Sequence, residues 1–314
     1  MDSPPLIVVC MKPVWRGGVP VRLHGEGRLH PDDLVSGPNP ADLGALGLAL
    51  RLAEQLKQEA PTSTPRILAL GMGAEARCLP ILRRALALGA THARHFTMDA
   101  EPPPGLGLAS HTWRVTRALA GWLHTQQPAL VLAGERGGDG GTGSFAALLQ
   151  GALNAGDAQR QTALAHKVVE AVPTGPDPTL GGAENGLRVV SRLERGYGQA
   201  MVLPFPAVLS VSAQVAPPAE PGLAQWLAAQ QAEIETGVLK LPPAPFAEEG
   251  HLRQPRPRVG AYSLPAPSEN AEGRIAAMVR MESGGGGRVL NGEPGQMADE
   301  LAGFLRERGY LQGV

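Results

Sequence analysis

The chain carries near its start the apolar run Leu6-Ile7-Val8-Val9-Cys10-Met11, in which no polar residue alternates with the apolar ones. A strand that is buried on both faces of a parallel sheet has this pattern, whereas a strand with one wet face alternates. We therefore expect residues 6–11 to form a central strand of such a sheet.

Strands and helices alternate in the residues that follow. We expect strands at 66–70, 93–98 and 130–133, and helices at 40–57, 108–126 and 142–151, with a further helix that ends at Gly89. Four later strands, at 162–172, 187–194, 199–203 and 207–211, would extend the sheet. This order predicts an α/β domain over residues 1–215, with a mostly parallel sheet, helices on both faces and a Rossmann-like adenine-nucleotide-binding fold.

Two parts of the chain fall outside this pattern. Residues 19–29 contain two short alternating segments around a glycine turn, which predicts a hairpin. Residues 216–314 are rich in proline, with short amphipathic stretches near Trp226 and at 275–281, a glycine run at 283–287 and a final helix at 296–308. We expect this second part to be an extended C-terminal arm that packs on the main domain or on a partner subunit.

The composition narrows the classes of function. Charged residues make up 18% of the 314 residues and the formal net charge is -1, which argues against a nucleic-acid partner. The two cysteines do not indicate a secreted disulfide framework. The sequence has no apolar run of about 18 residues that would span a bilayer. We therefore expect a cytoplasmic protein that does not itself span a membrane.

A glycine-dense stretch follows the strand expected at 130–133 and reads Gly134-Glu135-Arg136-Gly137-Gly138-Asp139-Gly140-Gly141-Thr142-Gly143. Between a strand and a helix start, bare backbone N–H groups and the helix dipole favour a phosphate. We interpret this stretch as a phosphate-binding loop. At another strand end, Gly71-Met72-Gly73 either lets an adenine or a ribose lie against the backbone or is only a tight turn between strand and helix. Asn39 would cap the helix that begins at Pro40, present its amide to the nucleotide, or do both.

Residues for bond-making chemistry do not stand out. Ser144 lacks the G-x-S-x-G context of a nucleophile, and the eight histidines lack the spacing of a metal site. The sequence also lacks a G-x-x-x-x-G-K-[ST] loop, the commonest route to nucleotide hydrolysis. The residues therefore indicate a protein that binds a nucleotide and is not an enzyme in its own right.

Several segments, taken in order, resemble the β subunit family of the electron transfer flavoproteins. Residues 7–14 (IVVCMKPV) are similar to its first strand and V-K-x-V turn, residues 39–42 (NPAD) to its N-P-F-D helix start, and residues 83–90 (RRALALGA) to its R-x-A-L-A-M-G-A stretch. Residues 128–134 resemble its D-L-V-L-x-G strand. Residues 192–199 and 203–210 resemble its signature R-E-x-D-G-G-x-E with L-P-A-V-x-T.

The resemblance implies a β subunit that pairs with an α subunit carrying the redox-active FAD. The β subunit itself would hold a structural AMP or, as in bifurcating members, a second FAD. Matched position by position, the resemblance implies that the nucleotide contacts Cys10, Met11, Asn39, Gly71, Met72, Gly73, Asp139, Gly140, Gly141, Thr142 and Gly143. Gly140 and Gly141 stand where the family has Asn and Gln, so backbone contacts to the phosphate would replace side-chain contacts.

The resemblance also implies a partner-recognition loop. Residues 222–227 (GLAQWL) are similar to the family's T-L-P-N-I-M, which makes Leu223 the apolar anchor for a flavoprotein dehydrogenase that donates electrons. Electrons would then pass towards the respiratory chain, with a membrane-bound quinone oxidoreductase as the candidate acceptor. The family's basic run after this loop is replaced by residues 228–231 (AAQQ), and its D-G-G by residues 195–197 (RGY). We therefore expect a demethylating or amine dehydrogenase as the donor in place of an acyl-CoA dehydrogenase.

Two alternatives remain open at the level of sequence. An NAD-dependent dehydrogenase would need an acidic residue at the end of the strand after the loop, and Glu170 is the only acidic residue within that strand, at a longer spacing than usual. A stand-alone adenine-nucleotide sensor of the universal-stress type would bind the nucleotide without a flavin-bearing partner.

Overall fold

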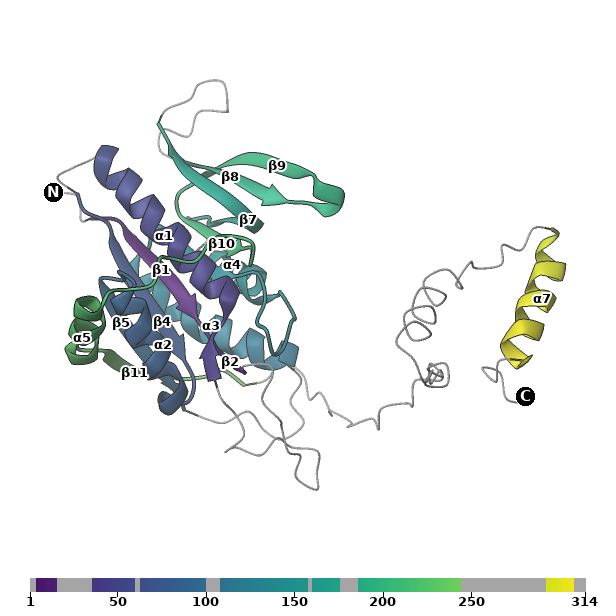
Figure 1. Cartoon of the computed structure of the whole chain (residues 1–314), viewed down its shortest axis with the longest axis horizontal. Coiled ribbons are helices and arrows are strands. Elements are labelled where there is room, and N and C mark those ends of the chain that lie inside the picture. The colour runs from purple at the N-terminus through teal and green to yellow at the C-terminus, as the bar shows by residue number, and fades with distance from the viewer. Residues whose placement is uncertain are drawn as a thin grey trace, which may run out of the picture. The chain divides into compact units, whose positions relative to one another are not determined.

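A computed structural model of the chain describes residues 4–15, 36–59, 63–99, 108–157, 160–175, 186–243 and 292–307 (Figure 1). The chain divides into two units, Met1–Gly250 and His251–Val314. The hairpin predicted at 19–29, the amphipathic stretch at 275–281 and the glycine run at 283–287 lie outside the described residues.

The described part of the first unit is built on one large sheet. Its strands are β1 (Leu6–Met11), β4 (Arg66–Met72), β5 (His92–Met98), β6 (Leu130–Gly134), β7 (Ala163–Thr174), β8 (Gly186–Arg192), β9 (Gly198–Pro204), β10 (Ala207–Val211) and β11 (Glu235–Leu239). Their order in the sheet is β11-β5-β4-β1-β6-β10-β7-β8-β9. Two short strands, β2 (Pro13–Trp15) and β3 (Ser36–Pro38), pair with each other in antiparallel fashion.

The sheet is parallel from β11 to β7, and only β8 and β9 run antiparallel to their neighbours. From β1 the chain moves to β4 and β5 on one side, and then crosses to β6 on the other. In open parallel sheets, a ligand crevice forms outside the carboxyl ends of the strands where the order reverses in this way. The fold therefore places a candidate crevice at the ends of β1, β4 and β6.

Helices cover both faces of the sheet, as the sequence predicts. The helices of the first unit are α1 (Pro40–Glu59), α2 (Glu75–Ala87), α3 (Leu108–Gln126), α4 (Phe145–Gly156) and α5 (Leu223–Gln231). Ile7 and Val9 of β1 belong to the apolar core under α1 and α2, whereas Val8 and Cys10 belong to the core under α3 and α4 (Figure 1). A strand between two cores needs apolar residues on both sides, which explains the unbroken run at 6–11.

Two glycines of α1 allow another segment of backbone to cross this helix. A Cβ at Gly44 would lie 2.8 Å from the Val215 carbonyl oxygen, and one at Gly47 would lie 2.6 Å from the Ala216 carbonyl oxygen. The chain therefore lies directly against α1 as it leaves the sheet after β10.

The structure corrects three expectations. Gly71 and Met72 are not part of a turn, because they continue β4 and pair with His95 and Phe96 of β5; only Gly73 lies in the turn. Helix α4 begins at Phe145 and not at Thr142. The segment at 222–227 is not a loop, because Leu223 begins helix α5.

One strand of the large sheet was not predicted from the sequence. The segment after α5 forms β11, which pairs with β5 at the edge of the sheet. Arg94 of β5 and Glu235 of β11 form an ion pair with 2.8 Å between Nη1 and Oε2. Helix α5 and strand β11, which follow residue 215, therefore belong to the first unit.

The described part of the second unit contains helix α7 (Pro294–Glu307), close to the helix predicted at 296–308. Its side chains Leu301 and Phe304 are about half exposed.

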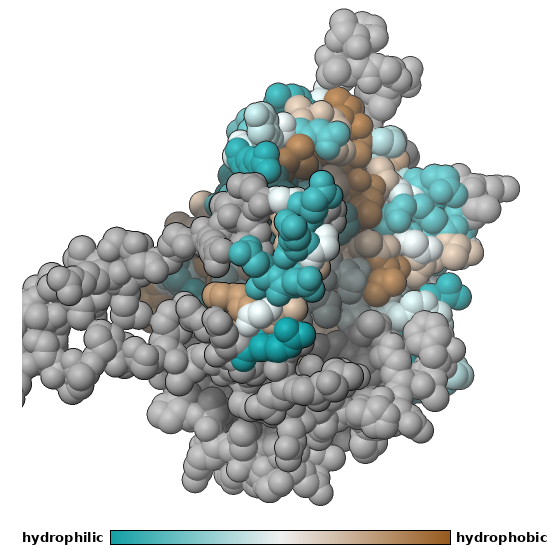
Figure 2. Space-filling view, turned by 90° about the vertical axis from the view of Figure 1, so that its right-hand side faces the viewer, coloured by the Kyte–Doolittle hydropathy of each residue, from teal (hydrophilic) through white to brown (hydrophobic). Residues whose placement is uncertain are grey.

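The space-filling view of the whole molecule shows brown hydrophobic residues among teal hydrophilic ones in the upper part of the described surface (Figure 2).

Candidate functional site

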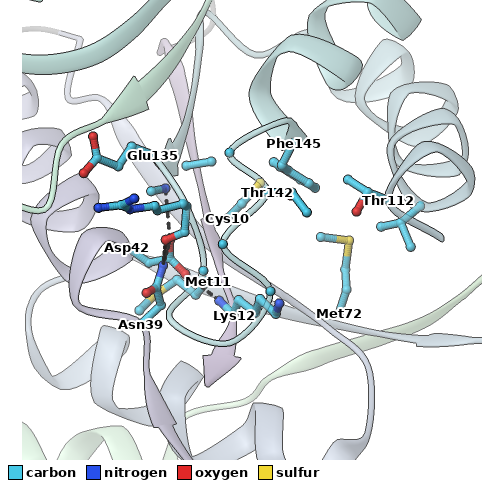
Figure 3. Close-up of a pocket in the computed structure, with 18 of the residues that line it drawn as sticks. Cys10, Met11, Lys12, Asn39, Asp42, Met72, Thr112, Glu135, Thr142 and Phe145 are labelled. Atoms are coloured by element: carbon cyan, nitrogen blue, oxygen red, sulfur yellow. Dashed lines mark hydrogen bonds between the residues drawn. The ribbon is translucent and has the colours of Figure 1, made fainter. Parts of the chain in front are cut away.

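A cavity of about 190 Å³ lies at the crevice that the strand order predicts. It is lined by the ends of β1, β4, β5 and β6, the start of α1, part of α3 and the glycine loop that follows β6 (Figure 3). The lining residues are Cys10, Met11, Lys12, Asn39, Asp42, Met72, Met98, His111, Thr112, Val115, Ala133, Gly134, Glu135, Arg136, Gly137, Gly140, Gly141, Thr142, Gly143 and Phe145.

A buried carboxylate holds two of these strand ends together. Asp42, in the first turn of α1, is only 4% exposed. Its Oδ2 accepts the backbone N–H of Lys12 at 2.8 Å, and its Oδ1 accepts the backbone N–H of Gly134 at 2.9 Å. Asn39 Nδ2 donates to the same Oδ1 at 3.0 Å. Asp42 therefore fixes the ends of β1 and β6 relative to each other and to α1.

The Asp42 carboxyl has an unusual proton affinity. Burial raises its pKa to about 6, although the hydrogen bonds from Lys12, Asn39 and Gly134 and the charge of Lys12 act in the opposite direction. A carboxylate that is removed from water loses its hydration, and the N–H donors replace only part of that loss.

Asn39 links this carboxylate to the glycine loop. Its amide nitrogen donates to Asp42 and also to the Arg136 carbonyl oxygen, at 3.1 Å. The side-chain amide therefore supports the loop, whereas the sequence suggested a helix cap or a nucleotide contact. The Asn39 carbonyl oxygen accepts the first backbone bonds of α1, from Asp42 and Leu43.

The glycine loop has a conformation that depends on its glycines. Gly141 has a φ of +63° and Gly143 a φ of +65°, values that residues with a side chain rarely adopt. The Gly141 N–H donates to the Gly137 carbonyl oxygen at 3.0 Å, which closes a turn. The loop therefore passes the cavity with little side-chain cover, as a phosphate-binding loop requires.

A lysine reaches this loop from the end of β1. Lys12 Nζ lies 2.7 Å from Asp139 Oδ1, and the same oxygen accepts the Gly140 N–H at 2.6 Å. Burial raises the pKa of Asp139, but the bonds from Lys12 and Gly140 outweigh this effect, and the pKa lies below its ordinary value. Asp139 is therefore an ionised carboxylate at neutral pH.

The opposite side of the cavity is mostly apolar. Met72, Met98, Val115 and Phe145 line it, and Figure 3 shows Met72 and Thr112 on the far side of the cavity from Asn39 and Asp42. His111 also lines the cavity, and its Nδ1 is buried without a hydrogen-bond partner in the described part of the chain. Burial, Arg114 and Lys12 lower the pKa of His111, so its ring is neutral at pH 7. An apolar wall with one unsatisfied polar atom fits a flat heteroaromatic base.

The structure brings most of the predicted site residues together. The cavity lining includes Cys10, Met11, Asn39, Met72, Gly140, Gly141, Thr142 and Gly143. It does not include Gly71, Gly73 or Asp139: a Cβ at Gly71 would face Leu82 of α2, and Asp139 acts through Lys12 and Gly140. The role of these residues in nucleotide binding remains a prediction.

Sequence reasoning missed the groups that organise the site. Lys12 and Asp42 were within quoted motifs, but neither was assigned a role. Lys12 directly follows a buried strand, where ligands bind in parallel sheets, and Asp42 lies in the first turn of a helix, where a carboxylate is favourable. Both positions therefore indicated a role at the site. Their partners are distant in sequence, and only the fold brings them into contact.

Leu223 lies on a separate surface, on α5. Leu223, Trp226 and Leu227 are 73%, 40% and 57% exposed. The far end of this helix is held by Arg83 of α2, whose Nη1 donates to the carbonyl oxygens of Ala229, Gln230 and Ala232. A cation at a helix C-terminus satisfies carbonyl groups that lack partners within the helix. Helix α5 therefore presents its apolar side chains from a fixed position.

The described residues contain no group of three or more His, Cys, Asp and Glu side chains placed to hold a metal ion. None of the described helices is long and apolar enough to cross a membrane.

Comparison with known proteins agrees with the geometry of the site. A search of curated proteins gives no match to this chain. The family model for the electron transfer flavoprotein domain matches residues 31–240, which include most of the sheet, the glycine loop and α5. This match covers more than half of the chain, and the chain therefore belongs to the electron transfer flavoprotein domain family.

Proposed function

We propose that this chain is the β subunit of an electron transfer flavoprotein. It forms a heterodimer with an α subunit that carries FAD, holds AMP in the crevice at the ends of β1, β4 and β6, and passes electrons from a flavoprotein dehydrogenase towards the respiratory chain. The observation that carries this proposal is the match to the electron transfer flavoprotein domain. It is supported by the crevice, which is lined by a glycine loop, a lysine and an apolar wall.

The residues of the crevice fit an adenine nucleotide. The apolar wall with His111 suits the base, and the loop at 140–143 with Lys12 suits the phosphate. The FAD of the α subunit supplies the redox chemistry. The residues of this chain bind and orient the nucleotide, and the chain is a carrier subunit and not an enzyme.

The two alternative functions have less support. The match to the electron transfer flavoprotein domain favours neither an NAD-dependent dehydrogenase nor a universal-stress sensor. Glu170 lies on β7, which is separated from the cavity-lining strand β6 by β10, so it is not placed to hold a ribose in this crevice.

Co-expression with a candidate α subunit tests the proposal. We expect a yellow heterodimer that releases FAD and AMP in equal molar amounts. Two FAD and no AMP per heterodimer would reject the AMP assignment, and a colourless homodimer with ATP would favour the sensor.

We also propose that the arm within residues 216–314 docks on the α subunit. A chain that ends at Gly287 should therefore retain less α subunit, and equal retention would reject this role.

Helix α5 is the proposed contact with the donor dehydrogenase. Leu223→Asp places a charge at its most exposed apolar position and should slow reduction of the complex by an amine dehydrogenase about tenfold at low carrier concentration. FAD content should not change. Val238→Asp, on the exposed side of β11, is the matched control and should leave the rate close to that of the wild type. Equal effects of the two variants, or rapid reduction by an acyl-CoA dehydrogenase, would contradict the assignment of surface or donor.

A further inference from the structure

The Asp139 carboxylate occupies the hydrogen-bond donors that a phosphate would need. Its Oδ1 accepts from Lys12 Nζ at 2.7 Å and from the Gly140 N–H at 2.6 Å. Lys12 and Gly140 both line the cavity, whereas Asp139 does not. An ammonium group and a loop N–H are typical partners of a phosphate oxygen, and here a carboxylate oxygen of the chain takes that place.

The pair between Lys12 and Asp139 is built into the loop. A Cβ at Gly137 would lie 2.8 Å from Asp139 Oδ1 and 3.2 Å from Lys12 Nζ, so the pair packs over a residue that has no side chain. The Lys12 backbone is fixed in turn by Asp42, and its side chain is about half exposed. The lysine can therefore exchange one anion for another without movement of the strand end.

The two carboxylates that line the cavity are engaged elsewhere. Asp42 accepts three N–H donors, and Glu135 Oε2 lies 3.5 Å from Arg192 Nη2. Arg136 also lines the cavity and, like Lys12, is exposed, but its described hydrogen bond is made by its carbonyl oxygen and not by its guanidinium. Among the described cavity residues, Lys12 is therefore the cation that an incoming phosphate would share with a carboxylate.

We propose that Asp139 competes internally for the phosphate donors and thereby selects nucleotides with a single phosphate. A phosphate engages Lys12 and the Gly140 N–H only after the Asp139 carboxylate has left them. The displaced carboxylate stays within the loop, one residue from Gly140, so its charge repels each additional phosphate group. In AMP a single phosphate group is repelled by the Asp139 carboxylate. ADP and ATP place more negative charge beside the same carboxylate and are repelled more strongly. This inference rests on the proposed nucleotide site and adds its selectivity.

Calorimetric titration of the nucleotide-stripped complex with AMP, ADP and ATP tests the inference. Asp139→Asn keeps the size and the oxygen acceptor of the side chain but removes its charge. We expect this variant to bind AMP about threefold and ATP about tenfold more tightly than the wild type, because a partly exposed charge contact such as that of Lys12 and Asp139 is worth on the order of a factor of three. Glu54→Gln, an equal change of charge on the exposed face of α1, should change neither affinity.

A second variant separates competition from direct contact. Lys12→Met should weaken AMP binding about tenfold or more, since a hydrogen bond to a charged group is lost. In the double variant, Asp139→Asn should give a smaller gain in AMP affinity than it gives in the wild type, because no ammonium group remains to be released. Non-additivity of this kind is the signature of two groups that share one interaction.

The possible results are distinguishable. Weaker binding of all three nucleotides by Asp139→Asn would overturn the inference, because the carboxylate would then hold the ligand. An equal gain for AMP and ATP would overturn the selectivity. If only the Asp139→Asn variant binds a nucleotide, competition is supported and the proposed AMP site of the wild type fails. If neither protein binds any nucleotide, both proposals fall.

Discussion

Replacement of Gly134 by alanine is expected to lower the free energy of unfolding by about 3 kcal/mol. The added Cβ would collide with Asp42 Oδ1 and would lie 2.7 Å from the Ala41 Cβ and 3.0 Å from the Ala41 carbonyl carbon. Ala41 and Asp42 belong to the first turn of α1, which packs directly on the sheet. Since backbone and a buried carboxylate cannot rotate away, α1 would have to move from the end of β6.

Gly151→Ala is the matched control for this variant. Gly151 lies within α4, and a Cβ there would meet no atom within 4 Å. Alanine is a better helix former than glycine, so this variant should be more stable than the wild type by about 0.5–1 kcal/mol. Urea unfolding of the full chain measures both changes. The clash at Gly134 is refuted if the two variants shift the transition midpoint in the same direction.

The Gly134→Ala variant should also impair the nucleotide site. The Gly134 N–H is one of the donors that hold Asp42, and Asp42 holds the Lys12 backbone. A displaced helix would separate Lys12 from the glycine loop. We therefore expect Gly134→Ala to lose AMP affinity even at temperatures where the chain stays folded, whereas Gly151→Ala should retain it.

Local sequence patterns were sufficient for most of the fold. The run at 6–11 became β1 with the predicted bounds, and α3 and β10 likewise match the predicted ranges 108–126 and 207–211. These elements have strong apolar patterns that agree with their tertiary surroundings, so propensity and packing favour the same structure. Gly89 ends the α2 region with a φ of +119°, as expected for a glycine after a helix.

The errors occurred where tertiary contacts decide the structure. Gly71 and Met72 would suit a turn by composition, but hydrogen bonds to β5 extend the strand through them. Helix α4 begins late because Gly143 has a φ of +65°, which is incompatible with a helix. Strand β11 contains glutamate, threonine and glycine in sequence, and it becomes a strand because the edge of β5 offers it a partner.

The location of the candidate site could be predicted from the sequence, but its hydrogen-bond network could not. Glycine-dense segments at strand ends indicated where a phosphate would lie. The contacts of Asp42 with Lys12 and Gly134 span 30 and 92 residues of sequence, and no local pattern specifies such pairs. Knowledge of the strand order is needed before the ends of β1 and β6 can be recognised as neighbours.

Asp42→Ala is expected to destabilise the chain by about 3 kcal/mol and to remove most of its affinity for AMP, because each buried N–H that loses its acceptor costs about 1–3 kcal/mol. The variant leaves the Lys12 and Gly134 N–H groups and the Asn39 amide without this acceptor. Removal of a buried carboxylate offsets part of that cost, since the carboxylate itself is poorly hydrated. Chemical unfolding and calorimetric titration with AMP measure the two effects. Glu54→Ala, on the exposed face of the same helix, should change neither.

The pH dependence of this cost identifies its origin. The pKa of Asp42 is raised to about 6 in the folded chain, above the ordinary 3.8, so the folded state holds the proton more tightly than the unfolded state. The stability that this group contributes is therefore complete below about pH 4 and is lost as the pH rises through about 6. The alanine variant lacks this titration, so the stability difference between wild type and variant should narrow as the pH rises from 4 to 7. A constant difference over that range would show that Asp42 titrates normally, and that the carboxylate joining β1, β6 and α1 is hydrated and not buried.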